Sequence, residues 1–341
     1  MDDFARLPSD DRRVYFEQAA ARLGLSAQMV EKDFWVCWSL KWLFDLDEFR
    51  DHLTFKGGTT LSKVYKVVER FSEDVDVAIE RSFLGFGGEN EPEQGASGKE
   101  QQRRIADLKV ACQAAIADRL QRQLRGAFEN ALCSESNWGL SLDPHDPDQQ
   151  SLLFHYPSAI TNLSTYFATS VKIELGARSD HFPVEKRTIT PYLGDAIPES
   201  LSNAQAEVRV LAAERTFWEK ATILHMLHHV PKDKKLPLRM SRHYYDVYRL
   251  ARSPIWQRAM GGIGLLDRVA VHKSIFFKVA WAHYDTARPG TLRLMPSEHL
   301  VDELRQDYLD MEAMFFGTHP TFQEIVSYLP ELEERINHAA G

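Results

Sequence analysis

The stretch from residue 53 to residue 79 constrains this chain more than any other. It contains a short extended segment, the Gly57-Gly58 pair, and apolar residues at helical spacing in a helix that we expect to end at Phe71. It ends in an alternation of acidic and apolar residues with the period of a strand, which puts Asp74 and Asp76 on the same side. The stretch therefore predicts a strand, a glycine turn, a helix and a second strand.

This order of elements favours a phosphate and metal site. Glycine permits a positive φ and close approach of a ligand, and a helix start offers N–H groups to a phosphate. Two carboxylates on one side of a strand repel each other unless a cation lies between them, and Mg²⁺ accepts one or two carboxylates with substrate phosphates. Alone, a Gly-Gly pair or an Asp-x-Asp is usually a turn or a strand edge, but together they favour transfer at phosphorus. The residues expected to hold a triphosphate are Gly57, Gly58, Thr59, Lys63 and Ser72, and those expected to hold Mg²⁺ or Mn²⁺ are Asp74 and Asp76.

The same residues carry a family resemblance. Gly57-Gly58-Thr59 and the run from Arg70 to Asp76 resemble the first motif of the AbiEii toxin family, which belongs to the nucleotidyltransferase superfamily with the polymerase-β-like enzymes. The upstream run from Glu31 to Val36 also resembles that family. The resemblance covers roughly residues 25 to 255.

The expected fold is α+β. We expect a nucleotidyltransferase core with N-terminal helices over residues 1–211, built on a small mixed sheet flanked by helices, and a helical C-terminal lobe over residues 212–341. Helices are expected over 10–22, over 27–44 with Ser26 as its cap, and over 99–127. The candidate strands after them are Phe128–Leu132, Gly139–Leu142, Leu152–Tyr156, Val171–Leu175, Arg187–Thr190 and Glu207–Leu211.

Three segments of this half have more than one interpretation. The charged triplet Glu31-Lys32-Asp33 is typical of a solvated helix face, although the resemblance favours Lys32 or Asp33 as a support of the active centre. The glycine-rich residues 84–99 indicate a mobile loop. The basic residues of the helix over 99–127 form either a solvated face or a surface that follows RNA phosphates.

A third carboxylate is expected on a neighbouring strand. Within residues 170–175, apolar residues alternate with Lys172 and Glu174. Glu174 is our candidate to complete the metal site or to act as general base on an attacking hydroxyl. The alternative is a polar residue on a half-exposed strand.

The second half supplies candidate nucleotide contacts. A helix over 212–230 carries Lys220, and its Glu-Lys-Ala resembles the family's second motif, which implies a contact with nucleotide phosphate. Ser241 is expected to cap a further helix, in which Arg242 and Asp246 are one turn apart and can pair. This run resembles the family's third motif, which implies that both face the nucleotide; Arg239 and His243 are weaker candidates.

A histidine cluster follows Lys220 on the same helix. His225, His228 and His229 have a spacing that suits a metal ion, but no further ligands are evident. A helix end exposed to solvent is the favoured interpretation.

Bulk properties narrow the class of protein. The 341 residues have a formal charge of −8, which argues against unspecific nucleic-acid coating but allows a local basic groove. Cys37, Cys112 and Cys133 lack metal spacing and favour a reduced compartment. No secretory pattern or membrane-spanning run is evident, so we expect a soluble cytoplasmic protein without a membrane partner.

The predicted function is transfer of a nucleoside monophosphate from an NTP to an acceptor, with release of pyrophosphate. Lys220 is expected to neutralise developing charge, and either Glu174 or Asp246 to activate the acceptor hydroxyl. The resemblance implies a toxin of a toxin–antitoxin or phage-defence system, a separate antitoxin protein and a tRNA 3′ end as acceptor. The alternatives are nucleotidylation or phosphorylation of a protein or small molecule, and a non-catalytic nucleotide-binding module.

Overall fold

The computed structural model describes residues 1–132, 137–161 and 168–339. The chain divides into two compact units. The first contains Met1–Val64 and Ser72–Val210, and the second contains Tyr65–Phe71 and the chain from Leu211 onward. A segment of seven residues in the middle of the first unit's sequence therefore packs with the second unit.

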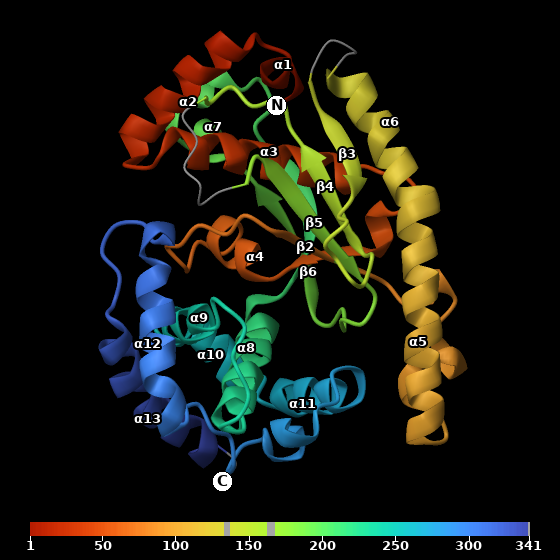
Figure 1. Cartoon of the computed structure of the whole chain (residues 1–341), viewed down its shortest axis with the longest axis vertical. Helices are drawn as coiled ribbons and strands as arrows, with labels where there is room; N and C mark the ends of the chain where they lie inside the picture. The colour runs from red at the N-terminus through yellow and green to blue at the C-terminus, as the bar shows by residue number, and fades with distance from the viewer. Residues whose placement is uncertain (133–136, 162–167, 340–341) are drawn as a thin grey trace. The chain divides into compact units, whose positions relative to one another are not determined.

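The described strands of the first unit form one seven-stranded mixed sheet in the order β3-β4-β5-β2-β1-β7-β6 (Figure 1). β1 runs antiparallel to β2 and parallel to β7, while β2 runs parallel to β5. The strands are β1 (Leu53–Lys56), β2 (Val75–Ile79), β3 (Gly139–Leu142), β4 (Ser151–His155), β5 (Ser170–Gly176), β6 (Val184–Ile189) and β7 (Ala206–Leu211).

Helices and an aromatic core cover one face of this sheet. Trp35 and Trp38 of α3 pack against Phe154 of β4, with ring centroids 5.8 and 5.5 Å apart, and Phe128 of α6 joins them. On β2, Val75 and Val77 are buried while the alternate residue Asp76 is partly exposed, so the acidic side chains lie on the other face. The helices of this unit are α1 (Asp2–Ala5), α2 (Ser9–Leu23), α3 (Ala27–Leu43), α4 (Gly58–Lys63), α5 (Gly98–Ala114), α6 (Gln121–Leu132) and α7 (Tyr192–Ala196).

Two expectations about this unit are wrong. The helix after the glycine turn, α4, ends at Lys63 instead of Phe71, and Lys66 has a left-handed φ of 52° that no helix accommodates. Residues Phe128–Leu132 continue the basic helix and are not a strand. A π-helical stretch, Ala115–Leu120, joins α5 to α6, and α6 lies beside β3 (Figure 1).

The other expected strands of the sheet are confirmed to within three residues at each end. The glycine-rich residues 84–99 contain short 3₁₀ turns and the first turn of α5. The predicted mobility of this segment stays a prediction.

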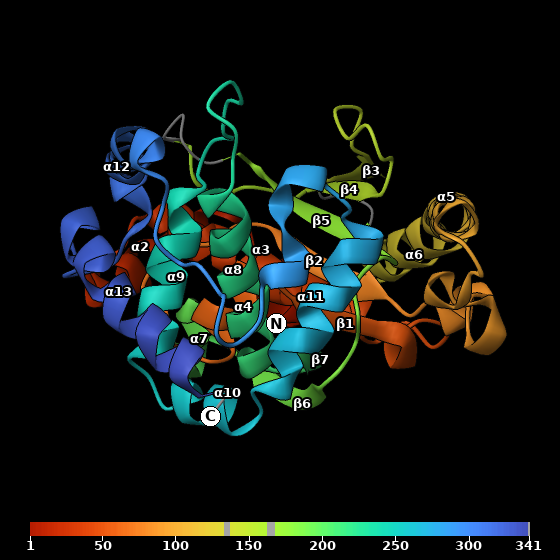
Figure 2. The same cartoon turned by 90° about the horizontal axis from the view of Figure 1, so that it is seen from below.

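The second unit is helical in its described residues. α8 packs against α9, α10 and α11, and α9 packs against α12 and α13 (Figure 2). Ser241 is the first residue of α9 instead of its cap, and its hydroxyl donates to Asp307. The helices are α8 (Ala213–His228), α9 (Ser241–Ala251), α10 (Ile255–Gly261), α11 (Gly264–Phe276), α12 (Val301–Asp310) and α13 (Phe322–His338).

Backbone hydrogen bonds hold the segment Tyr65–Phe71 in the second unit. The Phe71 N–H donates to the carbonyl of Met314 at 2.7 Å, and the Phe316 N–H donates to that of Glu69 at 2.8 Å. The Tyr65 hydroxyl donates to the carbonyl of Leu211 at 2.9 Å. The segment Tyr65–Phe71, which ends three residues before Asp74, therefore belongs structurally to the helical unit.

Two remaining expectations concern cysteines and membranes. Cys37 and Cys112 are buried free thiols, and Cys133 lies outside the described residues. Within the part of the chain that the structure describes, no helix is long and apolar enough to cross a membrane.

Candidate active site

Gly57 forms the turn between β1 and α4. Its φ of 84° lies in the region that L side chains rarely adopt. A Cβ added at Gly57 would lie 2.7 Å from Cγ of Asp76 and would overlap its carboxylate oxygen. Only glycine therefore lets the Asp76 side chain lie directly against this turn, and the close approach of a ligand that the sequence suggested here stays a prediction.

Asp76 and Glu174 are direct neighbours on adjacent parallel strands. Their Cα atoms are register partners of β2 and β5, so both side chains lie on the same face of the sheet. Lys172, two residues before Glu174 on that face, pairs with its carboxylate at 2.8 Å. Asp76 and Glu174 are 27% and 40% exposed, so both can reach a ligand.

Asp74 immediately precedes β2. Its partly buried carboxylate accepts no hydrogen bond from any residue that the structure describes. Burial, followed by the charges of Glu174 and Asp76, raises the pKa of Asp74 to about 6. The carboxylates therefore repel one another, and a bound cation would relieve this repulsion.

No complete metal site is preformed. Among the described residues, no group of three or more His, Cys, Asp or Glu side chains is arranged to hold a metal ion. Mg²⁺ needs only one or two protein carboxylates, because water and substrate phosphates complete its shell. The mutually repelling oxygens of Asp74, Asp76 and Glu174 fit such a hard cation, and metal binding by them stays a prediction.

Thr59 and Ser72 brace the chain that leads into Asp74. The buried Thr59 hydroxyl donates to the carbonyl of Asp74 at 2.6 Å and lies 2.9 Å from the Ser72 hydroxyl. Both residues thus lie beside the carboxylates, as expected, although their hydroxyls already have partners within the protein. Gly58, the first residue of α4, follows the turn directly.

The charged triplet of α3 is buried, so the expectation of a solvated face is wrong. Glu31 accepts hydrogen bonds from the Ala159 N–H at 2.6 Å and from Ser158 at 2.8 Å. Lys32 pairs with Glu73, the residue before Asp74. Lys32 therefore anchors the residue that precedes Asp74, and the supporting role of Lys32 or Asp33 at the active centre stays a prediction.

Lys63 is also held inside the first unit. Its ammonium lies 2.8 Å from the Asp33 carboxylate and 3.7 Å from the centre of the Tyr192 ring. Asp33 in turn accepts from the Tyr192 N–H at 2.6 Å. Because this ammonium is buried and paired, its position fits an internal ion pair better than the expected contact with a triphosphate.

In the second unit, Asp246 is the centre of a buried charge cluster. Its carboxylate accepts two hydrogen bonds from Arg70, both at 2.8 Å, and pairs with Lys220 at 2.8 Å. Burial acts to raise the pKa of Asp246, but Arg70 and Lys220 hold it well below its usual range. Asp246 is therefore a poor general base, and its arginine partner is Arg70 instead of the expected Arg242.

Lys220 and His243 extend this cluster. Burial lowers the pKa of Lys220 despite the opposing charge of Asp246. Nδ1 of His243 lies 3.4 Å from the Lys220 ammonium, and burial with this charge holds the pKa of His243 well below 6.5, so the ring is neutral at pH 7. The Arg242 residue is partly buried, and its side chain makes no ion pair or hydrogen bond with the described residues, whereas the Arg239 N–H donates to Asp307.

Sequence reasoning missed Arg70. The resemblance included it in a motif, but nothing in its spacing pointed to a partner more than 170 residues away. The burial of Arg70 and its pairing with Asp246 become evident only in the folded chain, where the helix that carries Asp246 lies beside Arg70.

The histidines at the end of α8 are buried or partly buried, so the expectation of a helix end exposed to solvent is wrong. His225 is buried and bonds through Nε2 to the carbonyl of His283 at 3.0 Å. Nδ1 of His228 lies 2.8 Å from the carbonyl of Met295. These rings join α8 to the chain after α11.

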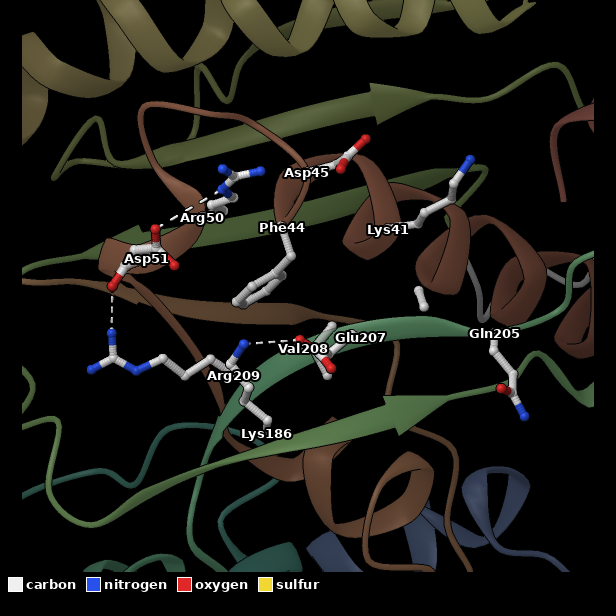
Figure 3. Close-up of a pocket in the computed structure, with 11 residues that line it drawn as sticks. Lys41, Phe44, Asp45, Arg50, Asp51, Lys186, Gln205, Glu207, Val208 and Arg209 are labelled. Carbon is white, nitrogen blue, oxygen red and sulfur yellow. Dashed lines mark hydrogen bonds and ion pairs between the residues drawn. The ribbon is translucent and has the colours of Figure 1, made fainter.

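A pocket of about 540 Å³ in the first unit contains none of the predicted site residues (Figure 3). Its cations already have partners. Lys186 pairs with Glu207 at 3.1 Å, and Arg209 donates to the carbonyl of Asp51 at 2.5 Å. This pocket therefore offers no unpaired charge for a phosphate at these positions.

The chain is similar to known proteins in both sequence and structure. The model of the family described as nucleotidyl transferase AbiEii toxin, type IV TA system, matches residues 41–328. No curated protein matches the chain. The structure is similar to that of MenT4, a nucleotidyltransferase toxin from Mycobacterium tuberculosis H37Rv, with a TM-score of 0.45 and 14% identity over 96% of this chain and 97% of that chain.

Proposed function

We propose that this chain, which belongs to the family of AbiEii nucleotidyl transferase toxins of type IV toxin–antitoxin systems, adds a nucleoside monophosphate to the 3′ end of an RNA, with tRNA as the favoured acceptor. Family membership makes the chain a nucleotidyltransferase that uses an NTP and implies an antitoxin partner. The acceptor, the metal, a cytoplasmic location and a role in phage defence are parts of the proposal. The observation that carries it is the side-by-side placement of Asp76 and Glu174 beside Asp74 and the Gly57 turn.

The carboxylates of Asp74 and Asp76 would hold the metal ion, and Glu174 on the neighbouring strand would act as the base. A bound Mg²⁺ would neutralise the charge of the triphosphate and of the leaving pyrophosphate. Their mutual repulsion, visible in the raised pKa of Asp74, supports this assignment because a cation converts it into attraction.

The proposed reaction is a single displacement at phosphorus. The acceptor hydroxyl oxygen bonds to the α-phosphorus, the bond from that phosphorus to the β-phosphate oxygen breaks, and pyrophosphate leaves with the electron pair. The hydroxyl proton passes to a base. Glu174 is the better candidate because it is 40% exposed, whereas Asp246 is fully buried and its pKa is held low.

The remaining residues bind and orient the nucleotide. We propose that Gly57 and Gly58 bring backbone close to the triphosphate, and that Thr59 and Ser72 fix the chain beside it. Lys220 and Arg242 are the proposed cationic phosphate contacts. Asp246 and Arg70 position Lys220 instead of touching the acceptor.

The test combines NTPs labelled at the α-phosphate with tRNA or with total protein. We expect label on tRNA and release of pyrophosphate, both dependent on Mg²⁺. Asp76→Ala should lower transfer by about 10²- to 10³-fold or more, as for loss of a transition-state charge stabiliser. Asp107→Ala, which removes an exposed carboxylate of α5, is the matched control and should transfer normally.

Three outcomes would contradict the proposal. Label on protein alone would replace RNA by a protein acceptor. Transfer from γ-labelled NTP without pyrophosphate would make the enzyme a phosphotransferase. Normal transfer by a folded Asp76→Ala protein would remove the carboxylates from the chemistry.

A further inference from the structure

A second pocket, of about 580 Å³, lies wholly within the second unit. Its size is within the range of small-molecule sites. Residues from the segment Tyr65–Phe71, from the end of α9 and from the turn before α13 line it. The side chains that matter here are Lys66, Tyr248, Arg249, Arg252, His319 and Glu324.

The charge of this pocket is positive on balance. Arg249 pairs with Glu69 at 3.0 Å and donates to the carbonyl of Val67 at 3.1 Å, so its charge is largely matched. The Glu324 carboxylate accepts from the N–H and the hydroxyl of Thr321 at 2.7 and 2.8 Å, as part of a helix cap. The lining thus carries Lys66, Arg249 and Arg252 against Glu324, and the Lys66 and Arg252 residues are exposed.

Arg252 is held in place by aromatic rings instead of by an acid. Its guanidinium lies 5.2 Å from the ring centre of Tyr248 and 5.7 Å from that of Tyr328. Among the described residues it makes no ion pair or hydrogen bond. A guanidinium ordered in this way keeps its donors available for an anion, and phosphate suits its fork of N–H groups.

Lys66 has a strained backbone at the same pocket. Its φ of 52° is left-handed, which costs energy for any residue with a Cβ, and such strain concentrates at ligand sites. The residues after Lys66 are held in the second unit by the hydrogen bonds of Glu69 and Phe71. Lys66 presents an exposed cation at the pocket wall.

Aromatic surface accompanies the cations. Tyr248 is partly buried in the wall, and the His319 ring stacks on Phe315 at 4.4 Å with 19° between their planes. Flat rings beside cations are what a nucleobase and its phosphate require together.

We propose that this pocket binds a phosphorylated nucleoside, with Arg252 and Lys66 at the phosphate and Tyr248 and His319 beside the base. This pocket shares no lining residue with the carboxylate site of the first unit. Two ligands carry this chemistry, a nucleotide unit of the RNA acceptor and a free nucleotide. The choice of these two rests on the proposed function.

The test is binding without turnover, on the full chain carrying Asp76→Ala. The probes are a fluorescent single-stranded RNA, read by anisotropy, and unlabelled nucleoside monophosphates as competitors. Adding Arg252→Ala should weaken binding about tenfold and lower the salt slope by roughly 0.7 per lost phosphate contact. Arg288→Ala, an exposed arginine of the same unit outside this pocket, should change neither.

The pattern of losses identifies the source. If Arg252→Ala weakens RNA binding and monophosphates do not compete with the RNA, the ligand is a nucleotide unit within RNA. If monophosphates compete with the RNA, the ligand is a free nucleotide. Unchanged binding in the folded Arg252→Ala and Lys66→Ala variants, or no binding of either probe to the parent, overturns the pocket assignment. Transfer to RNA by the wild-type chain is measured separately, so failure here leaves the proposed reaction intact.

Discussion

Gly57 and Asp76 set the tightest steric constraint at the candidate site. The turn backbone needs a φ of 84°, and the space where a Cβ would lie is filled by the Asp76 carboxylate. The positive φ and the Asp76 carboxylate at the Cβ position each exclude an L side chain, and the two effects can be separated by experiment. Gly85 has a similar φ of 88° with no atom within 4 Å of the place for its Cβ.

We therefore predict different outcomes for Gly57→Ala and Gly85→Ala. Each should cost about 1–3 kcal/mol of stability through backbone strain. Only Gly57→Ala should displace Asp76, and a displacement of about 1 Å can lower the transfer rate about 10²-fold. Thermal unfolding and transfer assays check the pair. Equal activity in the two variants would contradict the placement of Asp76.

Asp74 illustrates a cost that function imposes on stability. Its pKa is raised to about 6, above the value of about 3.9 in an unfolded chain. The folded protein therefore binds more protons than the unfolded one between these values. Ionised Asp74 lowers stability above pH 6, and this loss is regained as pH falls through 6.

We predict that Asp74→Asn stabilises the metal-free protein while abolishing transfer. At pH 8 with chelator, the Tm should rise by about 2–4 °C per kcal/mol of relieved repulsion. The difference in Tm between Asp74→Asn and the wild type should shrink toward pH 4.5. Mg²⁺ should also reduce this difference, because it stabilises only the wild type. Calorimetry at both pH values measures this, with Asp107→Asn as control. A variant no more stable than wild type at pH 8 would rule out the repulsion.

At the scale of elements, α3 acts through its charged residues. Glu31, Lys32 and Asp33 are buried and reach three different segments of the first unit. A helix with charged residues inside is stable only if each has a partner, because an unpaired buried charge is costly. The pair of Asp33 with Lys63 is the most buried of these. Variants of this pair distinguish a structural role of Lys63 from a contact with the triphosphate.

We predict that Lys63→Met destabilises the protein by about 3–5 kcal/mol, because it leaves Asp33 charged and buried. The double variant Asp33→Asn with Lys63→Met should recover most of that stability, since the amide still accepts from the Tyr192 N–H. Denaturant unfolding measures both. If Lys63 is structural, the double variant also regains transfer. A stable double variant with a greatly raised KM for NTP would instead return Lys63 to the triphosphate.

Local patterns predicted the elements that alternate or cap cleanly. The strands β2 and β5 were predicted from their period of two. The helix α3 was predicted from its cap, Ser26, whose hydroxyl accepts from the Met29 N–H. The end of α4 did not follow, because the residues after Lys63 are drawn into the second unit by hydrogen bonds that no local pattern contains. Of residues 128–132 only Phe128 is of a type enriched in strands, and the long helix continues through all five.

Side-chain roles were less predictable than elements. The neighbouring placement of Asp76 and Glu174 followed once two strands were expected. The burial of Lys32 and the capture of Asp246 by Arg70 depend on tertiary contacts between distant segments. Sequence spacing suggested the near partner, Arg242, in place of the distant one.

At the scale of the whole molecule, two units carry complementary chemistry. The first presents mutually repelling carboxylates beside a glycine turn, and the second contains buried cations and a separate cationic pocket. The family match spans residues 41–328 and so includes most of both. The net charge of −8 makes local placement of cations, instead of overall charge, the basis of any RNA binding.

The most direct test of the central claim is a crystal structure of the chain with Mn²⁺ and a non-hydrolysable NTP, with the metal located by anomalous scattering. The account predicts a metal ion bound by carboxylate oxygens of Asp74 and Asp76 and by the triphosphate, with the turn at Gly57 alongside. A metal and triphosphate bound elsewhere, with Asp74 and Asp76 free of both, would contradict it.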